Sequence, residues 1–222
     1  MISKLSTGTY PKAMQKCIAE KYEPSTVSKV MQLRVDGEYC DTYVDTCDAV
    51  VYGRKGKFKV WRNCPLLKSI TLNKLKDGYL PITPVAYRKI KGKEFDITKL
   101  KIDKYLTRTE ALNNPIWNAL CPDKKLLKQY VDMVFDKISG ENMGIYLSDD
   151  DEYAVRPVIL CRLGYGADAY DGGRLGSTLA RLVGVKNSTS GANVISHPEI
   201  CGNCKQCGQI WKSLMKHVKE EH

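Results

Sequence analysis

The chain has 222 residues, of which 43% are hydrophobic and 27% charged, and its formal net charge is +10, so wholesale disorder is excluded and one sizeable core is allowed. No stretch approaches the roughly 18 apolar residues of a membrane span, and the N-terminus lacks the apolar segment of a signal peptide. We therefore expect a cytoplasmic protein that makes no membrane contact.

The first half of the chain is predicted to be rich in strands. Residues 11–22 can form a helix, because their apolar side chains recur at helical spacing. Asp36 and Gly37 stand between alternating residues and predict a hairpin turn. Segments 50–61 and 82–97 each predict a further hairpin, with Lys and Arg alternating onto one face.

The second half is predicted to mix helices and strands. Thr107 can cap a helix that ends or is interrupted near Pro115. Asp123 can cap a strongly amphipathic helix, the most clearly marked helix of the chain. Strands are expected again at 143–147 and 153–163.

The positive charge is concentrated in one basic stretch, residues 54–106. It holds 15 Lys and Arg against four acidic residues, a balance of +11, whereas the rest of the chain carries −1. Concentrated charge attracts polyanions, and the interleaved aromatic residues are typical of sheets that bind nucleic acids, although they also serve as core residues. The predicted nucleic-acid-binding residues are Arg54, Lys55, Lys57, Lys59, Arg62, Arg88, Lys89, Lys91 and Lys93, joined near the C-terminus by Lys212 and Lys216.

The last 26 residues contain all three histidines and three of the nine cysteines. Cys204 and Cys207 form a C-x2-C pair, and His217 and His222 form an H-x4-H pair. Two thiolates and two imidazoles complete the tetrahedral set that a structural Zn²⁺ site requires. The other six cysteines are scattered singly, which favours reduced thiols and an intracellular location.

Several alternatives remain open for this metal site. Cys201 forms a second C-x2-C pair with Cys204, and His197 lies close upstream, so either can replace one of the four ligands. Three cysteines at this spacing are also typical of iron–sulfur binding, but Trp211 stands where the fourth cysteine would fall. Unliganded thiols and surface histidines are the remaining interpretation.

The same segment resembles the short C2H2 zinc finger of the bacterial Ros/MucR transcriptional regulators, in which nine residues separate the two ligand pairs. The resemblance covers 204–222 only. It implies that the two cysteines and two histidines bind Zn²⁺ and that the module contacts DNA. The matching residues are Cys204, Cys207, Gly208, Trp211, Lys212, Ser213, Leu214, His217 and His222.

Two further stretches give weaker signals. Residues 149–152 gather four acidic side chains that could hold Mg²⁺, although a solvated turn is the simpler interpretation. The glycine-rich stretch 163–177 lacks the spacings of nucleotide-binding loops. It could line a pocket, but a plain structural loop is favoured. The candidate pocket residues are Arg162, Tyr170, Arg174 and Arg181.

These patterns predict an α+β fold with a strand-rich N-terminal half, a mixed second half and a small C-terminal zinc finger. The main domain is expected at 1–186, a polar linker at 187–196 and the zinc module at 197–222. Residues 1–196 contain no histidine, so the common hydrolase arrangements are absent and a non-catalytic role is favoured.

The predicted function is that of an intracellular zinc-binding protein that engages DNA or RNA through the basic stretch. The first alternative is a protein–protein adaptor or inhibitor, which a virus or mobile element could encode, whose basic face binds an acidic partner. The second is a metal-dependent nuclease or phosphotransfer enzyme that uses the acidic cluster at 149–152.

Overall fold

A sheet forms the framework of the protein. The computed structural model describes residues 1–76, 78–148, 152–171 and 175–186, and Ser3–Val185 form one compact unit. The strands are β1 (Ile2–Gly8), β2 (Glu23–Pro24), β3 (Val44–Tyr52), β4 (Lys57–Trp61), β5 (Leu80–Pro81), β6 (Glu94–Asp96), β7 (Ile145–Tyr146), β8 (Ala154–Leu160), β9 (Ala169–Tyr170) and β10 (Ala180–Lys186). The main path through the sheet is β1-β10-β3-β8-β9-β7, with β2 on β10, β4 on β3, β5 on β8 and β6 on β4.

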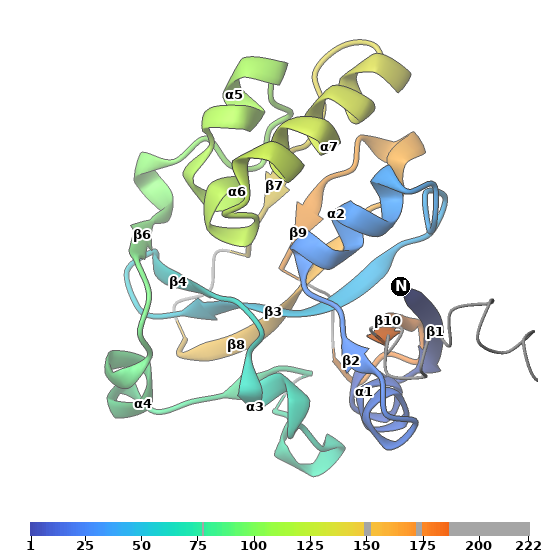
Figure 1. The fold of residues 1–222 in the computed structure, drawn as a ribbon. Helices are drawn as coiled ribbons and strands as arrows, with labels where there is room; N and C mark the ends of the chain where they lie inside the picture. The colour runs from blue at the N-terminus through green and yellow to red at the C-terminus, as the bar shows by residue number, and fades with distance from the viewer. Residues whose placement is uncertain (77, 149–151, 172–174, 187–222) are drawn as a thin grey trace, which may run out of the picture. The chain divides into compact units, whose positions relative to one another are not determined.

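Helices lie on both sides of the central strands. They are α1 (Tyr10–Ala19), α2 (Val27–Val35), α3 (Pro65–Lys68), α4 (Pro84–Lys89), α5 (Arg108–Asn113), α6 (Pro115–Leu120) and α7 (Lys124–Lys137), with 3₁₀ turns η1 (Leu72–Lys74), η2 (Ile97–Lys99) and η3 (Leu163–Tyr165). Figure 1 shows α2, α5, α6 and α7 on one side of β3 and β8, and α1, α3 and α4 on the other. None of the helices described is long and apolar enough to cross a membrane.

Strand β3 separates two hydrophobic clusters. All nine of its residues are buried. Because strand side chains alternate between faces, Val50 packs into the major core, which includes Trp117 and Tyr130, whereas Ala49 packs into the minor core, which includes Met14. The major core lies under α2 and α5–α7, and the minor core lies under α1 and α3.

Several sequence predictions are confirmed. Helix α7 begins after Asp123, whose carboxylate accepts hydrogen bonds from the backbone N–H groups of Lys125 at 2.9 Å and Leu126 at 3.1 Å. Thr107 forms a capping box with Glu110 at the start of α5. This helix ends at Asn113, and a new helix, α6, starts at Pro115. The hairpin predicted at 50–61 is the β3–β4 pair. The α+β fold class is confirmed.

Two predicted hairpins are wrong. Asp36 and Gly37 end helix α2, and Gly37 adopts a φ of +90°, which glycine tolerates at a helix end without steric cost. In segment 82–97, Thr83 caps helix α4 and Pro84 occupies its first turn, so only β6 is a strand there. The basic stretch is therefore less regular than expected. The predicted linker and zinc module lie outside the described residues.

Candidate ligand-binding site

A row of side chains crosses four strands on the face of the sheet opposite the major core. The strand register aligns Tyr146 of β7 with Tyr170 of β9, Tyr170 with Ile159 of β8, and Ile159 with Asp45 of β3. Because side chains alternate along a strand, these four residues, which we call the outer row, point away from the major core. Their neighbours in the major core are Ile145, Ala169, Leu160 and Val44.

One end of the outer row is aromatic. The rings of Tyr146 and Tyr170 are stacked, with centroids 5.1 Å apart and an interplanar angle of 17°. Tyr105 meets Tyr146 edge to face at 6.2 Å. Tyr105 remains 47% exposed and Tyr170 37% exposed, so aromatic surface is left open to solvent. Tyrosine is enriched at recognition surfaces, because its ring offers contact area and its hydroxyl a polar contact.

Cys161 connects the aromatic end to the rest of the face. Burial raises the pKa of its thiol to about 11, and hydrogen bonding of the thiolate to Tyr170 and Tyr43 opposes that rise. Both rings therefore lie beside this one sulfur. The thiol is protonated at neutral pH and is not an activated nucleophile.

The other end of the outer row opens into a pocket of about 490 Å³. Asp45 and Ile159 of the outer row line it. The register of β3 with β8 shifts between Asp45 and Ala49, an irregularity that often accompanies a site because it locally separates strands. The remaining lining residues are Tyr10, Asp41, Tyr43, Pro157, Arg162, Leu175, Ser177, Leu179, Ala180 and Arg181.

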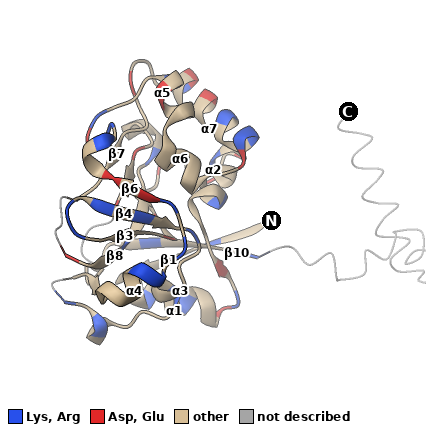
Figure 2. Ribbon diagram, turned by 90° about the vertical axis from the view of Figure 1, so that its left-hand side faces the viewer, with Lys and Arg blue, Asp and Glu red and all other residues tan. Residues whose placement is uncertain are grey.

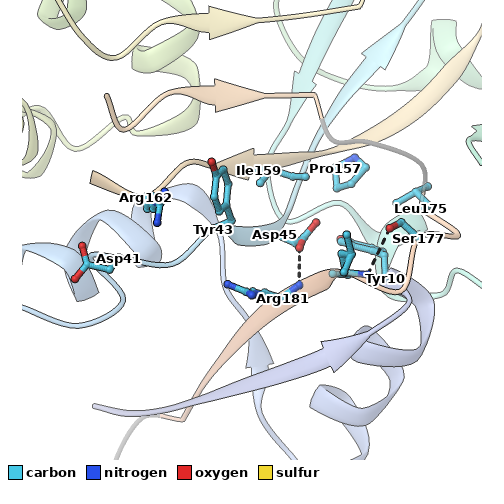
Figure 3. A pocket seen from close by; sticks show the side chains of 12 residues that line it. Tyr10, Asp41, Tyr43, Asp45, Pro157, Ile159, Arg162, Leu175, Ser177 and Arg181 are labelled. Carbon is cyan, nitrogen blue, oxygen red and sulfur yellow. Dashed lines mark hydrogen bonds between the residues drawn. The ribbon is translucent and has the colours of Figure 1, made fainter. Parts of the chain in front are cut away.

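The pocket has a charged end and an apolar end. Figure 3 shows Arg162, Arg181 and Asp41 to one side of Asp45, and Pro157 and Leu175 to the other. Tyr43 stands at the charged end, where its exposed ring continues the aromatic surface. This division suits a ligand that carries a polar group and an apolar body.

Two polar side chains of the pocket are already engaged by the main chain. The Asp45 carboxylate accepts a 2.6 Å hydrogen bond from the backbone N–H of Arg181, while burial raises the pKa of Asp45. The hydroxyl of Tyr10 donates to the carbonyl of Thr46 at 2.8 Å, and burial raises the pKa of Tyr10. These groups therefore shape the pocket through their bonds to the main chain.

The two arginines of the pocket are differently placed. Arg162 lies over the ring of Tyr165, 4.0 Å from its centroid, and its buried Nε–H has no acceptor among the described residues. Within the same residues, Arg181 makes no ion pair, and its side chain is exposed. Their guanidinium groups therefore keep hydrogen-bond donors available at the charged end.

A buried arginine supports this wall from behind. Arg34 is fully buried and donates to the carbonyl oxygens of Thr42 at 2.9 Å and Leu160 at 3.4 Å through Nη2. Thr42 precedes Tyr43, and Leu160 lies two residues before Arg162. Arg34 thus joins the two segments that carry these pocket residues.

The structure brings together part of the predicted pocket. Arg162 and Arg181 line it, whereas Tyr170 lies on the outer row and Arg174 is outside the described residues. The acidic cluster at 149–152 is described only at Glu152, which is exposed. No sequence pattern indicated Tyr10, Tyr43 or Asp45, because they meet the arginines only through the sheet topology.

Two of the predicted nucleic-acid-binding residues are committed to contacts within the protein. Lys59 is buried, and its ammonium group donates to the carbonyl oxygens of Tyr87 and Ile90. Lys57 pairs with Asp96 at 2.8 Å. Figure 2 shows the acidic residues of β6 directly beside the basic residues of β4. The others are distributed over the β3–β4 turn (Arg54, Lys55), the end of β4 (Arg62), helix α4 (Arg88, Lys89) and the following loop (Lys91, Lys93).

The predicted metal ligands cannot be placed. Cys204, Cys207, His217 and His222, with the alternates Cys201 and His197, lie outside the described residues, as do Lys212 and Lys216. Zn²⁺ binding there stays a prediction. In the part of the chain that the structure describes, no group of three or more His, Cys, Asp or Glu side chains could hold a metal ion.

Comparison with known proteins shows the fold. No family model matches the chain, and no curated protein matches it. A solved structure described as "Accommodation of massive sequence variation in Nanoarchaeota by the C-type lectin fold" is similar, with a TM-score of 0.63 and 18% sequence identity over 83% of this chain and 97% of that one. At this identity the likeness shows that the two share the C-type lectin fold and nothing more.

This finding corrects the function predicted from the sequence. A zinc-dependent protein that binds nucleic acid through a basic sheet is contradicted by the C-type lectin fold and by the lack of a metal-binding group in the described residues. The physical reason lies in the basic stretch: its lysines and arginines are divided between buried hydrogen bonds, ion pairs and separate surface elements. The charge left free at the surface is therefore smaller than the count along the sequence suggests.

Proposed function

We propose that the protein is a ligand-binding protein that recognises its ligand with the outer row and the adjoining pocket. The observation that carries this proposal is the continuity of the face. Stacked tyrosines, half-exposed Ile159 and a pocket of about 490 Å³ follow one another across four strands. A volume of this size lies in the range of small-molecule sites.

The fold supports the proposal. The similar solved structure is described as a C-type lectin fold that accommodates massive sequence variation. A scaffold that tolerates variation must hold its framework with one set of residues and vary another. In this chain the framework is the major core behind the outer row, so the outward side chains can differ without disturbing packing.

The chemistry of the pocket favours binding over catalysis. Asp45 and Tyr10, the polar groups at its centre, each hydrogen-bond to the main chain. The exposed aromatic and cationic groups are residue types that contribute strongly to recognition.

A fragment screen by NMR tests the proposal on the full chain labelled with ¹⁵N. We expect small aromatic and aliphatic acids, amides and sugars that bind to shift the backbone amides of residues 43–45, 158–162 and 175–181. A pocket-filling variant, Ser177→Trp, should abolish these shifts, because Ser177 lines the pocket and is exposed.

The matched control is Ser69→Trp, an exposed serine at the end of α3 that does not line the pocket. It should leave the shifts intact. Fragments that shift only amides remote from the outer row, or binding that survives Ser177→Trp, would overturn the proposal.

A further inference from the structure

We infer that the pocket selects an amphipathic carboxylate, with the acid group at Arg162 and Arg181 and the apolar body against Pro157 and Ile159. This inference rests on the proposed function and names the ligand class of that site. It starts from the unequal use of polar groups in the pocket. The Asp45 carboxylate accepts from the main chain and the Tyr10 hydroxyl donates to it, whereas Arg162 and Arg181 make no ion pair within the described residues.

The buried Nε–H of Arg162 is the first argument. A buried polar hydrogen without an acceptor costs free energy, because its hydration is lost and nothing replaces it. No described residue accepts from this Nε, and the guanidinium is held in place by the ring of Tyr165. Arg162 also lines the pocket, so its guanidinium can meet a ligand oxygen there. A carboxylate is the best match, since it is planar, accepts two parallel hydrogen bonds and carries the opposite charge.

Arg181 supplies the second cation. Its backbone N–H holds Asp45, which fixes the strand, while its side chain extends toward the charged end of the pocket (Figure 3). Burial raises the pKa of Asp45, and its Oδ2 atom already accepts from the backbone of the protein. The acidic group that still faces the charged end is Asp41, which is exposed at the rim.

The apolar end of the pocket determines that the part of the ligand away from its acid group is apolar. Pro157, Ile159 and Leu175 line it without polar side-chain atoms. At the rim, Leu179 is 82% exposed, so it offers apolar surface that the protein itself leaves uncovered. Covering such surface is favourable in proportion to its area. A simple carboxylate such as acetate would use only half of the site.

The experiment compares three probes of one shape: 4-phenylbutyrate, its neutral amide 4-phenylbutanamide, and the cation 4-phenylbutylamine. Affinities are measured on the full chain by NMR titration of the pocket amides at low salt. We expect the carboxylate to bind about tenfold or more tightly than the amide, since hydrogen bonds to charged groups exceed neutral ones. The amine should bind most weakly.

Variants assign the effect to residues. Arg162→Gln and Arg181→Gln should each lower carboxylate affinity about tenfold and leave amide affinity unchanged. Arg162→Lys should restore part of the loss, because it returns the charge without the planar fork. Asp41→Asn should tighten carboxylate binding a few-fold, since it removes a like charge at the rim. Arg88→Gln on the exposed surface of α4 is the matched control and should change nothing.

The outcomes separate the two proposals. If the amide or the amine binds the pocket as tightly as the carboxylate, the inference is wrong while the proposed function stands. If none of the probes shifts the pocket amides but fragments of another class do, the inference is likewise wrong. If nothing binds to this face, both fail.

Discussion

Four arginines of the protein form two pairs that use the same side chain in opposite ways. Arg34 and Arg156 are buried and engaged: Arg34 donates four hydrogen bonds, and Arg156 donates to Asp171 at 3.2 Å and lies 3.8 Å from the ring centroid of Tyr79. Arg162 and Arg181 line the pocket and make no ion pair within the described residues. A buried guanidinium that bonds a carboxylate or backbone carbonyls builds the fold, and one that lines a cavity without an ion-pair partner is available for a ligand.

The largest expected effect on stability comes from replacing Arg34, a member of the buried pair. Arg34→Met should lower the free energy of unfolding by on the order of 3 kcal/mol or more, because the carbonyls of Tyr39, Thr42 and Leu160 and the hydroxyl of Tyr130 lose their buried donor. Urea unfolding followed by tryptophan fluorescence measures this loss. Arg88→Met, on the exposed side of α4, should stay within about 0.5 kcal/mol of the parent. Equal effects in both variants would show that Arg34 is not structural.

Two buried carboxylates differ in the same way, by whether a cation lies beside them. Asp171 has the cation of Arg156, whereas Asp168 accepts a 2.7 Å hydrogen bond from the backbone N–H of Gly144 and has no cation partner among the described residues. Burial raises the pKa of Asp168 to about 6. The folded protein therefore holds this proton more tightly than the unfolded chain does, and stability should fall as pH rises from about 4 to about 6 and then level off.

Asp168→Asn should remove this contribution, on the order of 2 kcal/mol at neutral pH, because the amide stays neutral and can still accept from Gly144. Urea unfolding across the pH window measures it. Some slope should remain from Asp48, whose pKa burial also raises to about 6. A variant that is no more stable than the parent at neutral pH, with an unchanged pH profile, would contradict the assignment.

A smaller effect is expected within the buried cluster around Arg156. The hydroxyl of Tyr52 donates to Asp171 at 2.8 Å and accepts from the backbone N–H of Ser148 at 3.1 Å. Tyr52→Phe should cost about 1–2 kcal/mol, because both partners lose a buried contact. Thermal unfolding should show a midpoint several degrees lower. An unchanged midpoint would mean that the cluster is not held by this hydroxyl.

The smallest effect is expected for Arg181→Gln. Its guanidinium makes no ion pair within the described residues, and its bond to Asp45 uses the backbone, so the free energy of unfolding should change by less than about 0.5 kcal/mol. Urea unfolding under the conditions used for Arg34→Met gives the direct comparison. A loss approaching that of Arg34→Met would place Arg181 among the structural arginines and remove the contrast on which the ligand inference depends.

Local signals in the sequence were sufficient where one segment decides its own structure. Helix starts are fixed by the capping side chains of Thr107 and Asp123 and by the missing N–H of Pro115. Each prediction based on them is confirmed. Asp36–Gly37 shows the limit, since the same pair that closes a hairpin also ends a helix. Only the packing of α2 against α7 and β3 decides between these outcomes.

The pocket could be predicted only in part, because it is assembled from distant segments. Arg162 and Arg181 were recognisable as candidates beside a glycine-rich stretch, but Tyr10 and Asp45 join them through the order β10-β3-β8. The basic stretch misled for the same reason. Burial of Lys59 and pairing of Lys57 with Asp96 arise from contacts that linear charge counting does not contain.

The position of β10 has a consequence for how the protein matures. This strand, the last one described, inserts between β1 and β3, which lie at the opposite end of the described chain. Such non-local pairing gives a high contact order and slow folding. During synthesis, β1 and β3 must wait as unpaired edges until β10 leaves the ribosome, so a nascent chain stalled before Ala180 should depend on chaperones and be unable to bind ligand.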